Sequence, residues 1–205
     1  WNYNAEAYSK LADDVLTRLA CRDKKVRMLL EELIGYTFYR RNELRKAFML
    51  KGKRHNGKST FLDMIAYLLG EENISALDLS DLSHEYKASG LFGKLANLGD
   101  DIEDEFIPSA GIFKKIVSGD RMNANVKFAA PIEFNPYCKL IFSGNSIPRL
   151  GRGRDSDAIV DRLIIVPFNG SFNKNTEGFS PFIKYQLRTP ECMEYLIRIG
   201  IEGLK

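Results

Sequence analysis

A nine-residue run in the first third of the chain has glycine, lysine and hydroxyl side chains at a spacing that suits phosphate chemistry. The run is Gly-Lys-Arg-His-Asn-Gly-Lys-Ser-Thr over residues 52–60, and it matches G-x-x-x-x-G-K-[ST] at every fixed position. Glycines here let backbone N–H groups wrap an anion at the positive end of a helix dipole. The run therefore predicts a loop that binds the phosphates of a nucleotide.

Individual side chains of this run have separate expected roles, with ATP and Mg²⁺ as the cofactors. Lys58 would reach the β- and γ-phosphate oxygens, and Ser59 would place its hydroxyl on Mg²⁺. The expected nucleotide-binding residues are Gly52, Asn56, Gly57, Lys58, Ser59 and Thr60. The alternative is a chance match in an exposed turn rich in glycine and lysine. Against it, an apolar segment of strand length (47–50) precedes the run and an apolar helical pattern (61–69) follows it.

The composition is that of an ordinary globular protein. The 205 residues are 44% hydrophobic and carry a net charge of +3, which is too small to establish nucleic-acid binding. The apolar runs are far shorter than a bilayer span, and residues 1–4 do not begin a signal peptide. Three cysteines without a C-x-x-C pair indicate neither disulfides nor zinc, and we interpret all three as small core residues. We expect a soluble protein of a reducing compartment, with no membrane partner.

Apolar periodicity divides the chain into three expected parts. Residues 1–44 form a helical appendage whose second helix ends at Gly35, residues 45–170 form a P-loop ATPase core, and residues 171–205 form a helical tail. In the core we expect strands at 73–79, 94–99, 137–142 and 163–166, helix and turn at 82–92, and a helix at 112–117. This alternation predicts an α/β fold with a mostly parallel sheet flanked by helices, and a site at the carboxyl ends of the strands.

A phosphate loop needs acidic residues to hold Mg²⁺ and to align the attacking water. Asp100 and Asp101 follow the apolar strand 94–99, which we expect to lie beside the loop strand. One carboxylate would then face the metal and the next would face the water. Glu103 and Glu105 are alternatives for the second acid, because Asp101 is one methylene shorter than the glutamate of many ATPases. A solvated acidic turn is the structural alternative.

A polar residue at the end of another predicted strand could sense the γ-phosphate. Asn145 follows strand 137–142 and could orient the attacking water by hydrogen bonding. Taken alone, an asparagine after a strand is usually a turn former.

Five segments in one order carry a resemblance to a known family. They are the phosphate loop with Phe61, the segment from Gly93 to the Asp100–Asp101 pair, residues 113–120, the strand closing on Asn145 with Ile147 and Pro148, and residues 161–168. In this order they resemble the superfamily III helicase domain at the C-terminal end of phage and plasmid primase-helicases, over roughly residues 29–168. The resemblance implies a P-loop NTPase of AAA+ type.

The resemblance also implies a ring, usually a hexamer, with ATP bound between neighbouring copies. Asn145 matches the family's sensor asparagine, and Arg162 matches the arginine offered to the neighbour's ATP. Arg154 is a second, weaker candidate for that arginine. From the residues alone, Arg162 is more often a salt-bridge former at a strand edge.

The family has a hairpin before the sensor strand that enters the ring channel and grips DNA. Here it should lie within 122–134, with Lys127 and Phe128 near its tip. The lysine would meet a backbone phosphate and the aromatic ring would pack on a sugar or base. The alternatives are a core position for Phe128 and a solvated strand position for Lys127.

The resulting hypothesis is an ATP-dependent DNA helicase that replicates a phage, plasmid or mobile element in the cytoplasm of a bacterial host. Its partners would be single-stranded or forked DNA and further copies of the chain. Because position 1 is not methionine, we expect a fragment of a longer primase-helicase, with a primase domain as a further partner. The alternatives are a P-loop kinase for a small molecule, and an ATP-binding assembly module without helicase activity.

Overall fold

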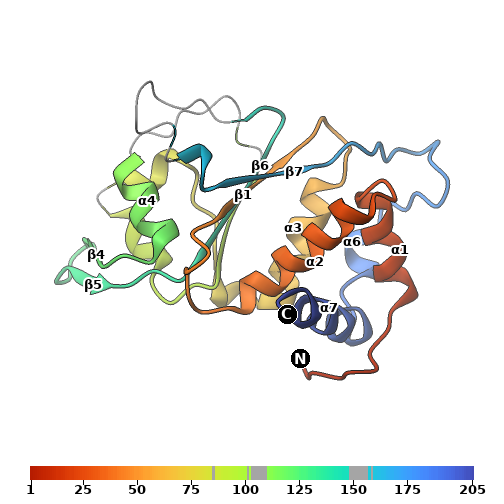
Figure 1. The fold of residues 1–205 in the computed structure, drawn as a ribbon, viewed down its shortest axis with the longest axis horizontal. Helices are drawn as coiled ribbons and strands as arrows, with labels where there is room; N and C mark the ends of the chain where they lie inside the picture. Colours follow the sequence, from red (N-terminus) through yellow and green to blue (C-terminus); the bar gives the residue numbers. More distant parts are fainter. Residues whose placement is uncertain (85, 101, 103–109, 148–156, 158) are drawn as a thin grey trace.

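A parallel β-sheet forms the centre of the molecule in the computed structural model, which describes residues 1–84, 86–100, 102, 110–147, 157 and 159–205 (Figure 1). Within these residues the sheet has five strands, and each neighbouring pair is parallel. In order across the sheet they are β2 (Ile74–Ser75), β3 (Ala96–Gly99), β6 (Lys139–Gly144), β1 (Ala47–Lys51) and β7 (Leu163–Pro167). The predicted parallel sheet flanked by helices is therefore confirmed.

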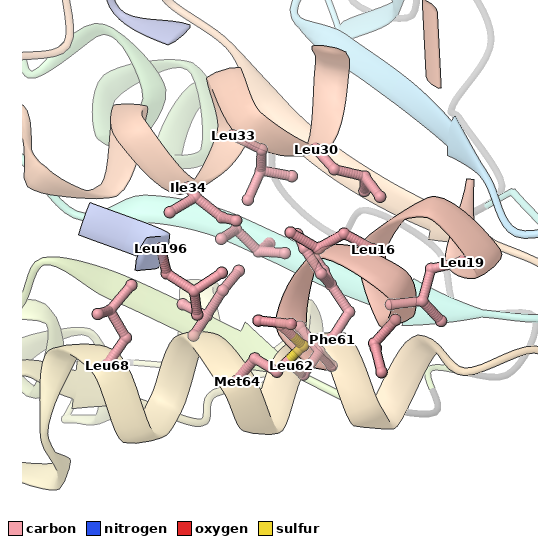
Figure 2. Close-up of a cluster of buried hydrophobic side chains, with 14 of the residues drawn as sticks. Leu16, Leu19, Leu30, Leu33, Ile34, Phe61, Leu62, Met64, Leu68 and Leu196 are labelled. Carbon is pink, nitrogen blue, oxygen red and sulfur yellow. The ribbon is translucent and has the colours of Figure 1, made fainter. Parts of the chain in front are cut away.

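Alternate residues of the strands face two separate cores. In β1, Phe48 and Leu50 belong to one apolar cluster and Ala47 and Met49 to the other, as the period of two along a strand requires. The first core is covered by α1 (Lys10–Leu19), α2 (Lys24–Phe38), α3 (Lys58–Leu69) and α7 (Pro190–Gly203). Figure 2 shows leucine side chains of α1, α2 and α7 meeting Phe61 and Met64 of α3. The phosphate-loop helix is thus fixed by apolar packing on its buried face.

The second core lies on the opposite face of the sheet. It is covered by α4 (Ala110–Ser118) and two short 3-10 helices, η2 (Ser80–Ser83) and η3 (Lys87–Leu91). A separate antiparallel pair, β4 (Met122–Ala124) and β5 (Ile132–Phe134), packs at its margin. In Figure 1 this hairpin lies at the opposite end of the molecule from α1.

The N-terminal helices and the C-terminal helix pack against each other. Ser9 caps α1 and Asp23 caps α2, each by accepting a backbone N–H bond. Arg27 of α2 joins the three helices because its guanidinium donates to Asp13 of α1 and to the Tyr195 hydroxyl of α7. The boundaries at residues 44 and 170 stay predictions, although both helical segments share the first core with α3.

Several expectations about local structure were wrong. Helix α2 does not end at Gly35 but continues to Phe38, and this glycine instead allows α2 to approach α7 closely: a Cβ there would lie 2.0 Å from the Gly200 carbonyl oxygen. The predicted strand 73–79 is only the two-residue β2 after the short 3-10 helix η1 (Glu71–Asn73). Cys21 is exposed between α1 and α2, whereas Cys138 and Cys192 are buried as expected. In the described part of the chain, no helix is long and apolar enough to cross a bilayer.

Candidate functional site

The predicted phosphate loop joins the carboxyl end of β1 to the first turn of α3. Two of its positions require glycine. A Cβ on Gly52 would lie 2.3 Å from the Phe168 carbonyl oxygen, and Gly57 has φ +88° with Leu19 Cδ2 only 2.2 Å from where its Cβ would be. Gly57 also has no side chain that could cap α3, and an anion at this helix N-terminus would meet the positive end of the helix dipole.

Lys58 begins α3 and folds back over the loop. Its side chain is buried, with 9% of the residue exposed, and Nζ donates hydrogen bonds to the carbonyl oxygens of Gly52 (2.6 Å) and Lys53 (2.9 Å). The ammonium is therefore held over the cradle that the loop forms. Ser59 follows it in the first turn of the helix and is exposed.

Asp100 and Asn145 lie at the carboxyl ends of neighbouring strands, but the strand order differs from the one expected. Strand β3 does not lie beside the loop strand, because β6 lies between β3 and β1. Asp100 directly follows β3 and accepts a hydrogen bond from the Ser143 hydroxyl of β6 at 2.5 Å. Asn145 follows β6, next to the point where the Gly52 N–H donates to the Gly144 carbonyl. The intervening strand thus brings Asn145 between the loop and Asp100.

A cavity of about 560 Å³ joins these residues. Its polar part is lined by loop residues 54–60 with Asp100 and Asn145, and its apolar part by Val15, Leu19, Phe172, Phe179, Pro181 and Ile183. A nucleotide has the same two-part character, with charged phosphates and a flat, largely apolar base. Of the residues expected to bind the nucleotide, all but Gly52 line this cavity; their role in binding stays a prediction.

Four side chains of the apolar wall come from the segment that we expected to form the C-terminal helical tail, and the other two come from α1. Residues 169–181 follow β7 and lie against the loop: Asn56 Nδ2 donates to the Gly170 carbonyl, and the Phe172 N–H donates to the His55 carbonyl at 2.7 Å. Arg18 of α1 holds the same segment by donating to the carbonyls of residues 177 and 178, at 2.8 and 2.9 Å. The carboxyl ends of parallel strands lie at the same end of a sheet. The sequence could therefore have indicated this segment as part of the site, because it directly follows the last predicted strand.

Arg162 lies at the opposite edge of the sheet. Its carbonyl accepts from the N–H of Ala47 at the start of β1, and Leu163 pairs with Ala47. Strand β7, with five residues, runs from Arg162 toward the cavity. The amino end of the strands, where Arg162 lies, is therefore about 15 Å from the carboxyl end, where the cavity lies. The structure therefore separates Arg162 from Lys58, Asp100 and Asn145 of the same copy.

The expected hairpin is present, with its pairing set by Asn123 opposite Glu133. Phe128 is 98% exposed in its turn at φ +61°, so a core position for this residue is excluded. The Lys127 ammonium lies 5.5 Å from the Phe128 ring centre. A cation and an aromatic ring are thus presented together at the turn of the hairpin. The hairpin strands lie at the opposite end of the molecule from α1, which lines the cavity (Figure 1).

Some predicted residues lie outside the part of the chain that the structure describes. These are Asp101, Glu103, Glu105 and Arg154. Among the described residues, no group of three His, Cys, Asp or Glu side chains could hold a metal by itself. Ser59 and Asp100 nevertheless face the same cavity and offer oxygen ligands, which suit Mg²⁺ when phosphate oxygens and water complete its shell.

Comparison with known families assigns the middle of the chain. Residues 50–162 match the family described as "Family of unknown function (DUF5906)". This match covers more than half of the chain, and the chain belongs to this family. The matched region runs from the end of β1 to Arg162 and so includes the loop, Asp100 and Asn145.

Similar proteins agree in fold and in part of the sequence. A protein of Acanthamoeba polyphaga mimivirus named "Putative helicase L207/L206" is 25% identical in a match of 164 residues. The match covers 76% of this chain and 17% of that protein. Two apo structures of the NrS-1 C terminal region superpose with TM-scores of 0.74 and 0.73, at 16% and 14% identity, over 100% of this chain and 51% of each solved chain. At such identities the structures show a shared fold alone. The chain spans only a minor part of the viral relative.

Proposed function

We propose that this protein is an ATPase of AAA+ type that drives helicase movement on DNA, as in superfamily III. The observation that carries the proposal is the cavity that receives Lys58, Ser59, Asp100 and Asn145 from the carboxyl ends of three neighbouring strands. The similarity to a viral protein named as a helicase supports the same function.

In the proposed complex, ATP occupies both parts of the cavity. The triphosphate lies on the loop and the start of α3, where Lys58 can move from the loop carbonyls to the phosphate oxygens. Phe172 and Leu19 contact the base. Ser59 and Asp100 would hold Mg²⁺, which would supply charge neutralisation at the phosphates. Asn145 orients the attacking water by a hydrogen bond from or to its side-chain amide.

The position of Arg162 supports a shared site between copies. Because Arg162 lies at the far edge of the sheet from its own cavity, it can assist hydrolysis only at the cavity of another copy. A head-to-tail contact of this kind closes into a ring when its rotation permits. The partner's Arg162 would then stabilise negative charge in the transition state.

The hairpin supports DNA as the second substrate. Lys127 and Phe128 present a charge and a ring without a hydrogen-bonding pattern for reading bases, which suits binding that is independent of sequence. A small-molecule kinase would have no use for these two exposed residues.

The proposal is tested by ATP hydrolysis with and without single-stranded DNA. We expect DNA to stimulate the parent, Lys58→Ala to abolish hydrolysis, and Arg162→Ala to abolish it while ATP still binds. Lys127→Ala should keep the basal rate and lose the stimulation. If DNA does not change the rate of ATP hydrolysis and Arg162→Ala remains active as a monomer, a ring motor is excluded.

A further inference from the structure

The hairpin is not part of the central sheet, so its position relative to the nucleotide cavity depends on contacts at its base. Strands β4 and β5 pair only with each other among the described residues. The base, residues 135–137, leads directly into β6. Residues 40–42, between α2 and β1, contact this base and are called the 40–42 clamp below.

Two side chains of the clamp hold the base directly. Arg40 Nη2 donates to the Tyr137 hydroxyl at 3.0 Å, and its guanidinium carbon lies 4.7 Å from the centre of the tyrosine ring. Asn42 Nδ2 donates to the carbonyls of Pro136 at 3.2 Å and Ile116 at 2.9 Å. The clamp thus joins the hairpin base to the end of α4 as well.

A buried lysine closes the contact from the other side. Lys139, the first residue of β6, is 1% exposed, and its ammonium donates to the carbonyls of Arg41 (2.9 Å) and Tyr137 (2.7 Å) and to Asn42 Oδ1 (2.7 Å). Burial of a cation is costly, and an apolar residue of similar size often serves stability as well or better. The ammonium adds directional hydrogen bonds, which hold the 40–42 clamp, the hairpin base and the start of β6 together at one point.

The contact of Lys139 with the 40–42 clamp lies at the amino ends of two strands whose carboxyl ends lead to the cavity. Strands β1 and β6 are neighbours, and they lead to the phosphate loop and to Asn145 respectively. A displacement of β6 against β1 when the cavity changes its occupant would therefore reach the contact between the clamp and the hairpin base.

We propose that Arg40, Asn42 and Lys139 are positioning residues that couple the hairpin to the nucleotide cavity. This inference rests on the proposed function, because the coupling is useful only if the hairpin binds DNA. None of the three lines the cavity, so the basal ATPase reaction does not require their side chains.

The test compares Arg40→Ala with Arg41→Ala. Both residues are exposed and both changes remove one positive charge, but the Arg41 side chain pairs with Glu43 and contributes only its carbonyl to the clamp. We expect Arg40→Ala to keep the basal ATPase rate and to lower its stimulation by single-stranded DNA about twofold to fivefold, the size of one exposed cation–π contact. Arg41→Ala should match the parent.

Hydrogen exchange gives a second measurement that needs neither ATP nor DNA. We expect residues 122–137 to exchange faster in Arg40→Ala and in Lys139→Met, with α2 and α7 unchanged; Tyr137→Phe should have a smaller effect because it keeps the ring. If the parent is not stimulated by DNA, the proposed function is wrong. The role of the 40–42 clamp is tested separately. It is contradicted if Arg40→Ala and Arg41→Ala show the same stimulation of the ATPase rate by DNA and the same amide hydrogen exchange in residues 122–137.

Discussion

Ser143 of β6 donates its hydroxyl hydrogen to the Asp100 carboxylate at the end of β3. This bond crosses between the two strands that carry the proposed sensor and the proposed metal ligand. It orients the carboxylate toward the cavity from a serine that is itself fully buried. Asp100 is therefore held in place before any ligand binds, which is what an effective metal ligand needs.

Replacement of Ser143 should impair hydrolysis without unfolding the protein. Because a hydrogen bond to a charged group is lost, we expect Ser143→Ala to lower kcat for ATP about tenfold or more and to raise the Mg²⁺ concentration needed for half-maximal rate. Ser75→Ala is the matched control, since Ser75 also donates to a neighbouring strand residue, Asn97, but lies away from the cavity. An unchanged kcat and Mg²⁺ dependence in Ser143→Ala would contradict the role given to Asp100.

The apolar wall of the cavity should determine affinity rather than rate. Phe172→Ala removes a ring from the expected base position, so we expect KM for ATP to rise about tenfold with kcat little changed. Phe182→Ala is the control, because Phe182 is an exposed phenylalanine ten residues away that does not line the cavity. Equal KM values for ATP in the two variants would mean that the base of ATP does not contact Phe172.

The contact between α2 and α7 should not tolerate a methyl group. A Cβ on Gly35 would overlap the Gly200 carbonyl, so we expect Gly35→Ala to lower the free energy of unfolding by about 1–3 kcal/mol. Gly90→Ala should be close to neutral, because its Cβ would have its nearest neighbour, Leu77 Cδ1, at 4.0 Å. Thermal denaturation of both variants checks this, and equal stability would mean that α2 and α7 are farther apart than described.

Lys139 should give the protein a stability that increases with pH in the alkaline range. Burial lowers the pKa of this ammonium to about 8 from an ordinary value of 10.5, so between these pH values the unfolded chain binds more protons than the folded protein. The free energy of unfolding should rise across this window in the parent, relative to Lys139→Met. Burial raises the pKa of both neighbours, Cys138 and Tyr36, to about 12 in the folded protein, so their titration in the unfolded chain opposes the effect of Lys139. Parent and variant share this opposing contribution, and the comparison between them therefore isolates Lys139. Parallel pH profiles for parent and variant would contradict a lowered lysine pKa.

The phosphate loop and the main strands could be predicted because their signals are local. The loop depends on glycines at fixed positions, and Gly57 does adopt a positive φ; the strands are short apolar runs buried on both faces. The sheet order could not be predicted in the same way. Strands 94–99 and 47–50 gave no sign that β6 would lie between them, because that strand comes later in the chain.

The remaining errors concern residues whose role depends on distant parts of the chain. Gly35 has the form of a helix stop, but the close approach of Gly200 explains it. The sequence places Lys139 in an expected strand but gives no sign of its partners, which include a carbonyl contributed by a segment almost a hundred residues earlier. Phe172 lies in a stretch without periodicity, and only the arrangement of β7 beside β1 brings it to the cavity.

Mixing two inactive variants tests the central claim most directly, namely that each cavity hydrolyses ATP with the help of another copy. Lys58→Ala keeps Arg162 and Arg162→Ala keeps the loop, so a random equal mixture would contain both functional halves at about a quarter of its interfaces. We expect each variant alone to be inactive and the mixture to recover about that fraction of the parent's ATPase rate. Full activity of Arg162→Ala alone, or no recovery in mixed assemblies that have been shown to form, would contradict the account.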